Sequence, residues 1–346
     1  MKNASRTVLF PLIGIRSTVC IEDVSVLFAH NNTAVNAEDS GLSLNYTVDY
    51  LTIFLRRSQR RIDHLKLMNY SMTVDEKKVE ALVHTSGLQY SDFDSKNGQP
   101  KPWQLTKLLE SARFFSHHWP LDDSGRTFRD YAEVTSDRMT FLITSRMDIE
   151  YNLYDPSIPK SPLDIKVQGG YVGTSSLNSI TTVQTKCGQP LLSNVNHVVS
   201  IDGATRRPKV LPDWWREKYA KSGAKFTSLK FEKYTKPDSV EPFNIHVVRS
   251  DLDGNNHTNW TCYVRFALDG LYHNAKHGKL DKFKDIDRRG LQSMELLFSG
   301  ESFDEDKLEV YVWQEDGDEY KVRVHIEKVK NFIFQGTFCF FEQTLY

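Results

Sequence analysis

The chain has 346 residues, of which 39% are hydrophobic and 12% aromatic, enough to bury the core of one large domain or two ordinary ones. Its formal net charge is −1 and no long block carries one sign, which argues against a nucleic acid or another polyanion as the main partner. The four cysteines form no Cys-x-x-Cys pair, which argues against a zinc site and a disulfide framework and fits a reducing compartment. We therefore expect no metal and no cofactor.

The first 80 residues are predicted to be an N-terminal extension of unclear role. Within it, residues 51–68 have a pattern compatible with a helix that carries arginines on its polar side. The first 20 residues lack acidic side chains and contain Lys2, Arg6 and Arg16, which loosely resembles a mitochondrial transit segment but also suits an ordinary strand. No apolar run approaches the length of a membrane span. We expect a cytoplasmic protein, with the mitochondrion as the alternative.

Residues 82–212 are predicted to form a first structural repeat. It opens with a strand at residues 82–90, which leads into the tetrapeptide Ser-Asp-Phe-Asp at 91–94. Lys101-Pro102 then starts a helix, because proline suits a first helical turn and the apolar residues that follow recur on one helical face. Four further strands are predicted, at residues 138–151, 163–171, 176–186 and 191–202.

A linker is predicted at residues 213–241, which are rich in Lys, Gly, Ser and Pro. Trp214 and Trp215 at its start are expected to pack against the first sheet. Residues 242–346 then form a second repeat.

A polar loop opens the second repeat, since residues 250–259 contain two acids, three amides and His257. Apolar residues then recur from Trp260 to Leu271 on one face, which predicts a helix of about 14 residues with Thr258 or Asn259 as its cap. Polar groups before the helix lie at its positive end, where developing negative charge is stabilised. The alternative is a capped helix preceded by an Asx-rich turn that has no chemical role.

Strands follow the second helix as they follow the first, at residues 291–298, 307–314, 319–328 and 331–341. Asp316-Gly317 between two of them is a hairpin signal. The tetrapeptide at 91–94 recurs as Ser-Asp-Leu-Asp at 250–253, in both cases before a helix, which indicates an internal duplication. The predicted fold is α+β, a tandem (double) hot-dog in which each repeat has a long helix wrapped by a curved antiparallel sheet.

Three segments resemble the plant and bacterial acyl-ACP thioesterases. Residues 251–259, Asp-Leu-Asp-Gly-Asn-Asn-His-Thr-Asn, resemble that family's Asp-Leu-Asp-x-Asn-x-His-x-Asn signature. Residues 296–302, Leu-Leu-Phe-Ser-Gly-Glu-Ser, are similar to its Glu-Cys segment. Residues 205–212, with Thr-Arg-Arg-Pro and then Leu-Pro, are similar to the end of its first repeat. The resemblance covers about residues 82–342.

The resemblance implies hydrolysis of fatty acyl thioesters, either acyl-ACP or acyl-CoA. It places the family's functional residues on Asp253, Asn255, His257 and Glu301, with Ser302 at the position of the family's cysteine. Because an unactivated serine is a far weaker nucleophile than a thiolate, we expect water to attack, with His257 and Glu301 orienting it and taking its proton. Asn255 and amides at the helix start are expected to hold the oxyanion, and Asp253 to fix the loop.

One active site per chain is expected, in the second repeat, because the first repeat keeps Asp92 and Asp94 without a histidine after them. The first repeat is expected to pack against this site and to shape the acyl pocket. The partners that fit this interpretation are an acyl carrier protein and a second copy of the chain.

Two other functions stay open. A non-catalytic acyl-binding or scaffold protein on the same fold is supported by Ser302. A hot-dog hydratase also has Asp and His close together, but usually with a longer gap that contains a proline, which is absent between Asp253 and His257. No Gly-x-Ser-x-Gly segment is present, which argues against an α/β-hydrolase thioesterase.

Overall fold

The computed structural model describes residues 63–203, 205–315, 317 and 320–345. The helix predicted at 51–68 lies outside these residues as far as position 62, and residues 63–67 are helical. Asp316 of the predicted hairpin turn also lies outside them. In the described part of the chain, no helix is both long enough and apolar enough to cross a membrane.

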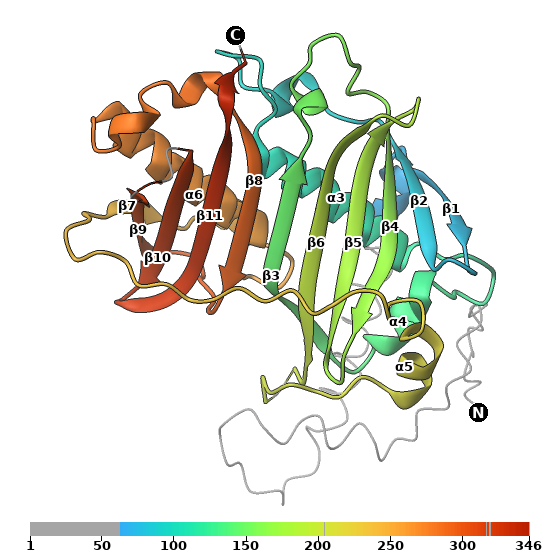
Figure 1. Cartoon of the computed structure of the whole chain (residues 1–346). Coiled ribbons are helices and arrows are strands. Elements are labelled where there is room, and N and C mark those ends of the chain that lie inside the picture. The colour runs from blue at the N-terminus through green and yellow to red at the C-terminus, as the bar shows by residue number, and fades with distance from the viewer. Residues whose placement is uncertain (1–62, 204, 316, 318–319, 346) are drawn as a thin grey trace, which may run out of the picture.

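The described strands form one antiparallel sheet of 11 strands, in the order β1-β2-β4-β5-β6-β3-β8-β11-β10-β9-β7 (Figure 1). The first half contains β1 (Ser71–Asp75), β2 (Glu80–Thr85), β3 (Met139–Ile149), β4 (Leu163–Val172), β5 (Ser176–Thr185) and β6 (Pro190–Ile201). The second half contains β7 (Phe243–His246), β8 (Arg289–Phe298), β9 (Lys307–Gln314), β10 (Lys321–Lys328) and β11 (Asn331–Thr344). Pairing of β3 with β8 joins the halves into one continuous sheet.

Two long helices, α3 (Pro102–His118) and α6 (Trp260–Lys276), lie on the same face of the sheet and contact each other (Figure 1). The side chain of Asn259 caps α6 by accepting a hydrogen bond from Thr261 N (2.9 Å). Near the middle of α6, a Cβ on Gly270 would lie 2.8 Å from Val310 Cγ1, so only glycine lets the helix approach β9 this closely. Most residues of the apolar face predicted for this helix are buried, and the helix contacts β9 and β10 of the second half.

The segment between the halves crosses the opposite face of the sheet, after the short helix α5 (Asp213–Tyr219) (Figure 1). Asn178 Nδ2 of β5 donates to Thr227 O (2.9 Å). Further along, the hydroxyl of Tyr234 donates to Gly336 O of β11 (2.8 Å). Hydrogen bonds with both halves of the sheet thus hold the crossing segment in place.

Trp215 anchors the start of that segment. Its side chain is fully buried, its Nε1 donates to Arg129 O (2.7 Å), and the guanidinium of Arg129 lies 5.0 Å from its ring centroid. Trp214 is 40% exposed. The anchoring expected of both tryptophans therefore depends on Trp215.

The two halves repeat the same elements, and the loops before their helices repeat the same hydrogen bond. Asp253 N donates to His257 O at 2.8 Å, and Asp94 N donates to Gln99 O at the same distance. The predicted double hot-dog is confirmed. Its duplication extends to the loop that carries the candidate site.

The differences from the predicted elements lie at the edges of the sheet. The edge strands β1 and β7 are five and four residues long with alternating exposure, which gives a weak sequence pattern. The strand predicted at 82–90 ends at Thr85, because the chain turns at Gly87 with φ of 79° and passes so close to Lys160 O that a Cβ would lie 2.3 Å from it. Since β1 begins at Ser71, the first sheet includes residues that were predicted to belong to the N-terminal extension.

His117, near the end of α3, is buried, and neither of its ring nitrogens has a hydrogen-bond partner in the described part of the chain. Its ring stacks on that of Tyr131 at a centroid distance of 4.3 Å. Burial, and then the positive charges of Arg113 and Arg129 and the neighbouring His118, hold the pKa of His117 well below its usual value.

This buried histidine predicts a pH-dependent stability. The folded state keeps His117 neutral, whereas the unfolded chain binds a proton near pH 6.5, so stability should be lost as the pH falls below about 6.5, by up to about 1.4 kcal/mol per pH unit. Urea unfolding of the wild type and His117→Phe between about pH 5 and pH 7.5 tests this, with the variant losing less stability on acidification. A stability difference between them that is the same at every pH would contradict the assignment.

The tight contact at Gly270 predicts a large effect of a small substitution. Gly270→Val should lower the free energy of unfolding by about 1–3 kcal/mol, because the added methyl groups push α6 away from Val310. Gly254→Ala is the control, since a Cβ there meets nothing within 4 Å, and should change stability by less than about 0.5 kcal/mol. Equal effects of the two substitutions in denaturant unfolding would argue against this packing.

Candidate active site

The loop that precedes α6 is fixed at its base by Asp251. Its buried carboxylate pairs with Arg265 of α6 and accepts a hydrogen bond from Val248 N (3.1 Å). Its carbonyl accepts a hydrogen bond from Asn259 N (2.8 Å), at the residue that caps the helix. The loop therefore leaves and rejoins the body of the protein at one point, beside the first turn of α6.

Inside this loop, Asp253 fixes the backbone. Its Oδ1 accepts hydrogen bonds from Asn255 N (2.7 Å) and His257 N (3.3 Å), while its own amide donates to His257 O (2.8 Å). Asn256 takes the left-handed conformation that closes the turn, with φ of 61°. The carboxylate therefore determines where His257 lies.

His257 meets Glu301, which follows β8. The chain at this point is held by Gly300 N, which donates to Ile333 O of β11 (3.2 Å). Glu301 Oε1 lies 3.4 Å from His257 Nδ1, and the two side chains are 28% and 19% exposed. The structure thus brings together the histidine and the glutamate that the sequence predicts for the site, 44 positions apart along the chain, at a place partly open to solvent.

The first half of the chain also contributes to this place. Arg206, in the segment after β6, pairs with both carboxylate oxygens of Glu301, and its Nη2 lies 2.5 Å from Oε2. Its guanidinium stacks 4.5 Å from the ring centroid of Phe141, whose ring lies 6.2 Å from that of His257. On the other side, the ring of Phe303 stands edge-on to His257 at 5.2 Å. Arg206 and Phe141 were not predicted as site residues, although Arg206 belongs to one of the segments that resemble the thioesterases.

Ser302, at the position of the family's cysteine, faces inward. It is fully buried, and its hydroxyl bonds with those of Thr258 (2.7 Å) and Tyr263 (2.8 Å). Its carbonyl accepts a hydrogen bond from Thr258 N (2.8 Å). Burial raises the pKa of Tyr263 to about 12, so its hydroxyl stays protonated as a donor. Ser302 therefore ties the glutamate segment to the start of α6 and has no exposed surface.

Glu110 of α3 is a further carboxylate at the start of α6. Its oxygens accept hydrogen bonds from Asn259 Nδ2 (3.1 Å to Oε2) and from Trp260 Nε1 (3.1 Å to Oε1). Negative charge is favoured at a helix N-terminus. The helix of the first repeat thus holds the helix start of the second, which no local sequence pattern could have indicated.

Asn255 is exposed, and its Nδ2 lies 3.5 Å from Asp253 Oδ2. It makes no hydrogen bond to His257 or Glu301 among the described residues. Of the amides near the helix start, Thr261 N is bonded to the cap, whereas no hydrogen bond from Gly254 N is present in the described part. No cluster of three or more His, Cys, Asp or Glu side chains among those residues is arranged to hold a metal ion.

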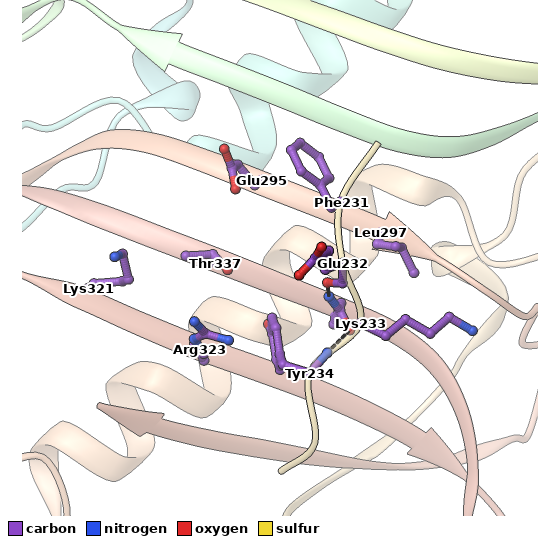
Figure 2. Close-up of a pocket in the computed structure, with 10 residues that line it drawn as sticks. Phe231, Glu232, Lys233, Tyr234, Glu295, Leu297, Lys321, Arg323 and Thr337 are labelled. Carbon is purple, nitrogen blue, oxygen red and sulfur yellow. Dashed lines mark hydrogen bonds between the residues drawn. The ribbon is translucent and has the colours of Figure 1, made fainter. Parts of the chain in front are cut away.

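Two hollows lie away from these residues. One, of about 270 Å³, lies under the crossing segment and is lined by Tyr234, Glu295, Arg323 and Thr337, among others (Figure 2). The other, of about 520 Å³, includes Cys339 and neighbouring residues of β8, β10 and β11. Neither is lined by His257 or Glu301, so the candidate site is separate from both hollows.

Comparisons with known proteins give likeness in structure only. No family model matches the sequence, and no curated protein matches it. A 12:0-ACP thioesterase from Umbellularia californica superimposes with a TM-score of 0.57 at 15% identity, over 76% of this chain and 97% of that one. An acyl-ACP thioesterase from Bacteroides thetaiotaomicron gives a TM-score of 0.54 at 15% identity, over 78% of this chain and 100% of that one.

An oleoyl thioesterase from Lactobacillus plantarum gives a TM-score of 0.57 at 16% identity, over 80% of this chain and 98% of that one. In each case nearly the whole length of the solved protein is matched. At this level of identity the likeness establishes the fold, a double hot-dog like that of these thioesterases.

The contacts of Ser302 predict a structural role. Ser302→Ala should lower the free energy of unfolding by about 1–3 kcal/mol, because it leaves the buried hydroxyls of Thr258 and Tyr263 short of a partner. Ser299→Ala, three residues earlier and exposed, is the control and should change stability by less than about 0.5 kcal/mol. Abolished thioester hydrolysis in Ser302→Ala with unchanged stability would instead make this serine a nucleophile.

Proposed function

We propose that this protein hydrolyses fatty acyl thioesters, releasing a free fatty acid and a thiol, with His257 as the general base. The observation that carries the proposal is the contact of His257 Nδ1 with Glu301 in a fold that this chain shares with solved thioesterases. A base oriented by a carboxylate beside a helix start is an arrangement suited to acyl transfer.

The geometry supports a division of roles between the two residues. Because Glu301 faces Nδ1, that nitrogen carries the proton and Nε2 keeps the lone pair. Nε2 accepts a proton from water as the water oxygen attacks the thioester carbonyl carbon. The tetrahedral intermediate then expels the thiolate, which takes the proton from the imidazolium, and the acid and the thiol are left.

Asn255 and the amides at the start of α6 are proposed to stabilise the oxyanion. The side-chain amide of Asn255 is exposed beside the loop, and Gly254 N is available as a donor. Each well-placed donor is worth roughly 10²–10³ in rate. Asp253 is proposed to act only by positioning the loop, since its Oδ1 accepts hydrogen bonds from the amides of Asn255 and His257.

The substrate and setting are proposed at a finer level from the same resemblance. The thiol is that of an acyl carrier protein or of coenzyme A, and the reaction belongs to fatty acid or lipid metabolism in the cytoplasm. One site per chain is proposed, in the second repeat, with the chain acting as a homodimer. Because the buried Ser302 serves packing, its departure from the family's cysteine gives no support to a non-catalytic acyl-binding protein.

The test is hydrolysis of a panel of acyl-CoA and acyl-carrier thioesters, followed by free thiol. His257→Ala and Glu301→Gln should each lower kcat/KM by about 10² or more, because the base or its orientation is lost. Asn255→Ala should lower kcat by about 10²–10³.

His246→Ala and Asp304→Asn are matched controls on exposed positions of the second repeat, and should leave kcat/KM unchanged. If the wild type is active and both His257→Ala and Glu301→Gln keep its kcat/KM, the proposed site is refuted. Acyl ligand binding without turnover on any substrate would instead favour the non-catalytic acyl-binding function.

A further inference from the structure

We infer that Arg206 of the first repeat is a positioning residue of this site, which holds the carboxylate of Glu301 toward the Nδ1 edge of His257. The inference rests on the proposed function and names a contribution to it from the other half of the chain. It makes the site composite, with the base and its glutamate from the second repeat and the residue that orients them from the first.

The contacts of Arg206 fix the carboxylate of Glu301 that lies beside His257. One guanidinium nitrogen contacts both carboxylate oxygens, so rotation of the carboxylate is restrained as well as its position. The face of the guanidinium stacks on Phe141 of β3 at 4.5 Å. Because the ring of Phe141 also lies 6.2 Å from that of His257, one aromatic ring borders both the arginine and the base.

The backbone of Arg206 is held in a costly conformation. Its φ is 58°, in the left-handed region, which costs a residue other than glycine roughly 1–2 kcal/mol. Asp202 holds this turn, since Asp202 O accepts a hydrogen bond from Arg206 N (2.9 Å) and Asp202 Oδ1 accepts one from Thr205 N (2.8 Å). Strain of this kind is concentrated at functional sites, where the surrounding structure fixes a side chain.

The energetics favour a role in geometry over a role in stability. The side chains of Arg206 and Glu301 are 40% and 28% exposed, and exposed ion pairs contribute only about 0–1 kcal/mol to folding. In contrast, misplacing a catalytic group by about 1 Å can cost about 10² in rate. Loss of Arg206 should therefore be visible in turnover far more than in unfolding.

The same contact supports the division of roles proposed for the two residues. The guanidinium occupies both oxygens of Glu301, which fixes this carboxylate as the partner of His257 Nδ1. Glu301 is therefore suited to orient His257, and the imidazole is left to take the proton of water. With Arg206 in place, His257 is the base and Glu301 is the residue that orients it.

Arg207 is a matched control within the same turn. It carries the same charge one position away, it is exposed, and its side chain makes no hydrogen bond or ion pair among the described residues. Arg206→Gln and Arg207→Gln change the net charge of the protein equally. Any general effect of charge on substrate encounter is therefore shared by both, and what differs is the contacts of the Arg206 side chain with Glu301 and Phe141.

The kinetic test compares Arg206→Gln, Arg206→Ala and Arg207→Gln on the acyl-CoA thioester that the wild type turns over best. Arg206→Gln should lower kcat about 10- to 100-fold with KM changed less than about threefold, and Arg207→Gln should match the wild type. Guanidinium ion at millimolar concentration should restore part of kcat in Arg206→Ala and in no other variant. A rise in KM with kcat intact would overturn the inference and make Arg206 a substrate-binding residue.

A second measurement does not require activity. Side-chain ¹⁵N spectra of His257 in the folded proteins report which ring nitrogen carries the proton. Wild type and Arg207→Gln should show the proton on Nδ1, whereas Arg206→Gln should show both neutral forms, because Glu301 is no longer held against that nitrogen. Identical spectra for all three proteins would overturn the inference.

The two measurements separate the inference from the function on which it rests. If the wild type hydrolyses no thioester but the spectra differ as expected, the proposed function fails and the positioning by Arg206 stands. If the wild type is active and Arg206→Gln equals Arg207→Gln in both measurements, the function stands and the inference fails.

Discussion

The pairing of β3 with β8 is the constraint on which the rest of the structure depends. It joins the two halves edge to edge, from Thr144↔Leu297 to Asp148↔Ser293, and so places both long helices on one face of a single sheet. Glu110 of α3 can then reach the start of α6, and Arg206 can reach Glu301. The candidate site is located beside this seam, where Arg206 of the first repeat meets Glu301 of the second.

Duplication followed by divergence explains why we propose one site in two similar halves. Gln99 occupies in the first loop the place of His257 in the second, as the shared hydrogen bond to the preceding aspartate shows. Its side chain donates to Asp287 O (3.3 Å), and Asn97 Nδ2 donates to the same carbonyl (2.7 Å). The first loop therefore packs against the other repeat, with an amide that cannot act as a base where the second loop has an imidazole.

The sequence predicts what depends on local periodicity and leaves out what depends on contacts between repeats. The faces of α3 and α6 and the central strands follow from spacing alone, whereas the short edge strands β1 and β7 give too few residues for a pattern. His257 and Glu301 could be named from motifs. The pair of Arg206 with Glu301 spans 95 positions and depends on strand register. The inward direction of Ser302 depends on packing. Neither can therefore be predicted from the sequence.

Three acids around the candidate site are anchored by hydrogen bonds or by an ion pair. Asp253 is bonded to backbone amides, Glu110 to the side chains of Asn259 and Trp260, and Glu301 to Arg206. A carboxylate with such donors is held in place. In the described part of the chain, Glu301 is the one acid within ion-pair distance of His257, and it faces Nδ1. In the proposed mechanism these fixed carboxylates aim a single base, His257, at the water that attacks the thioester.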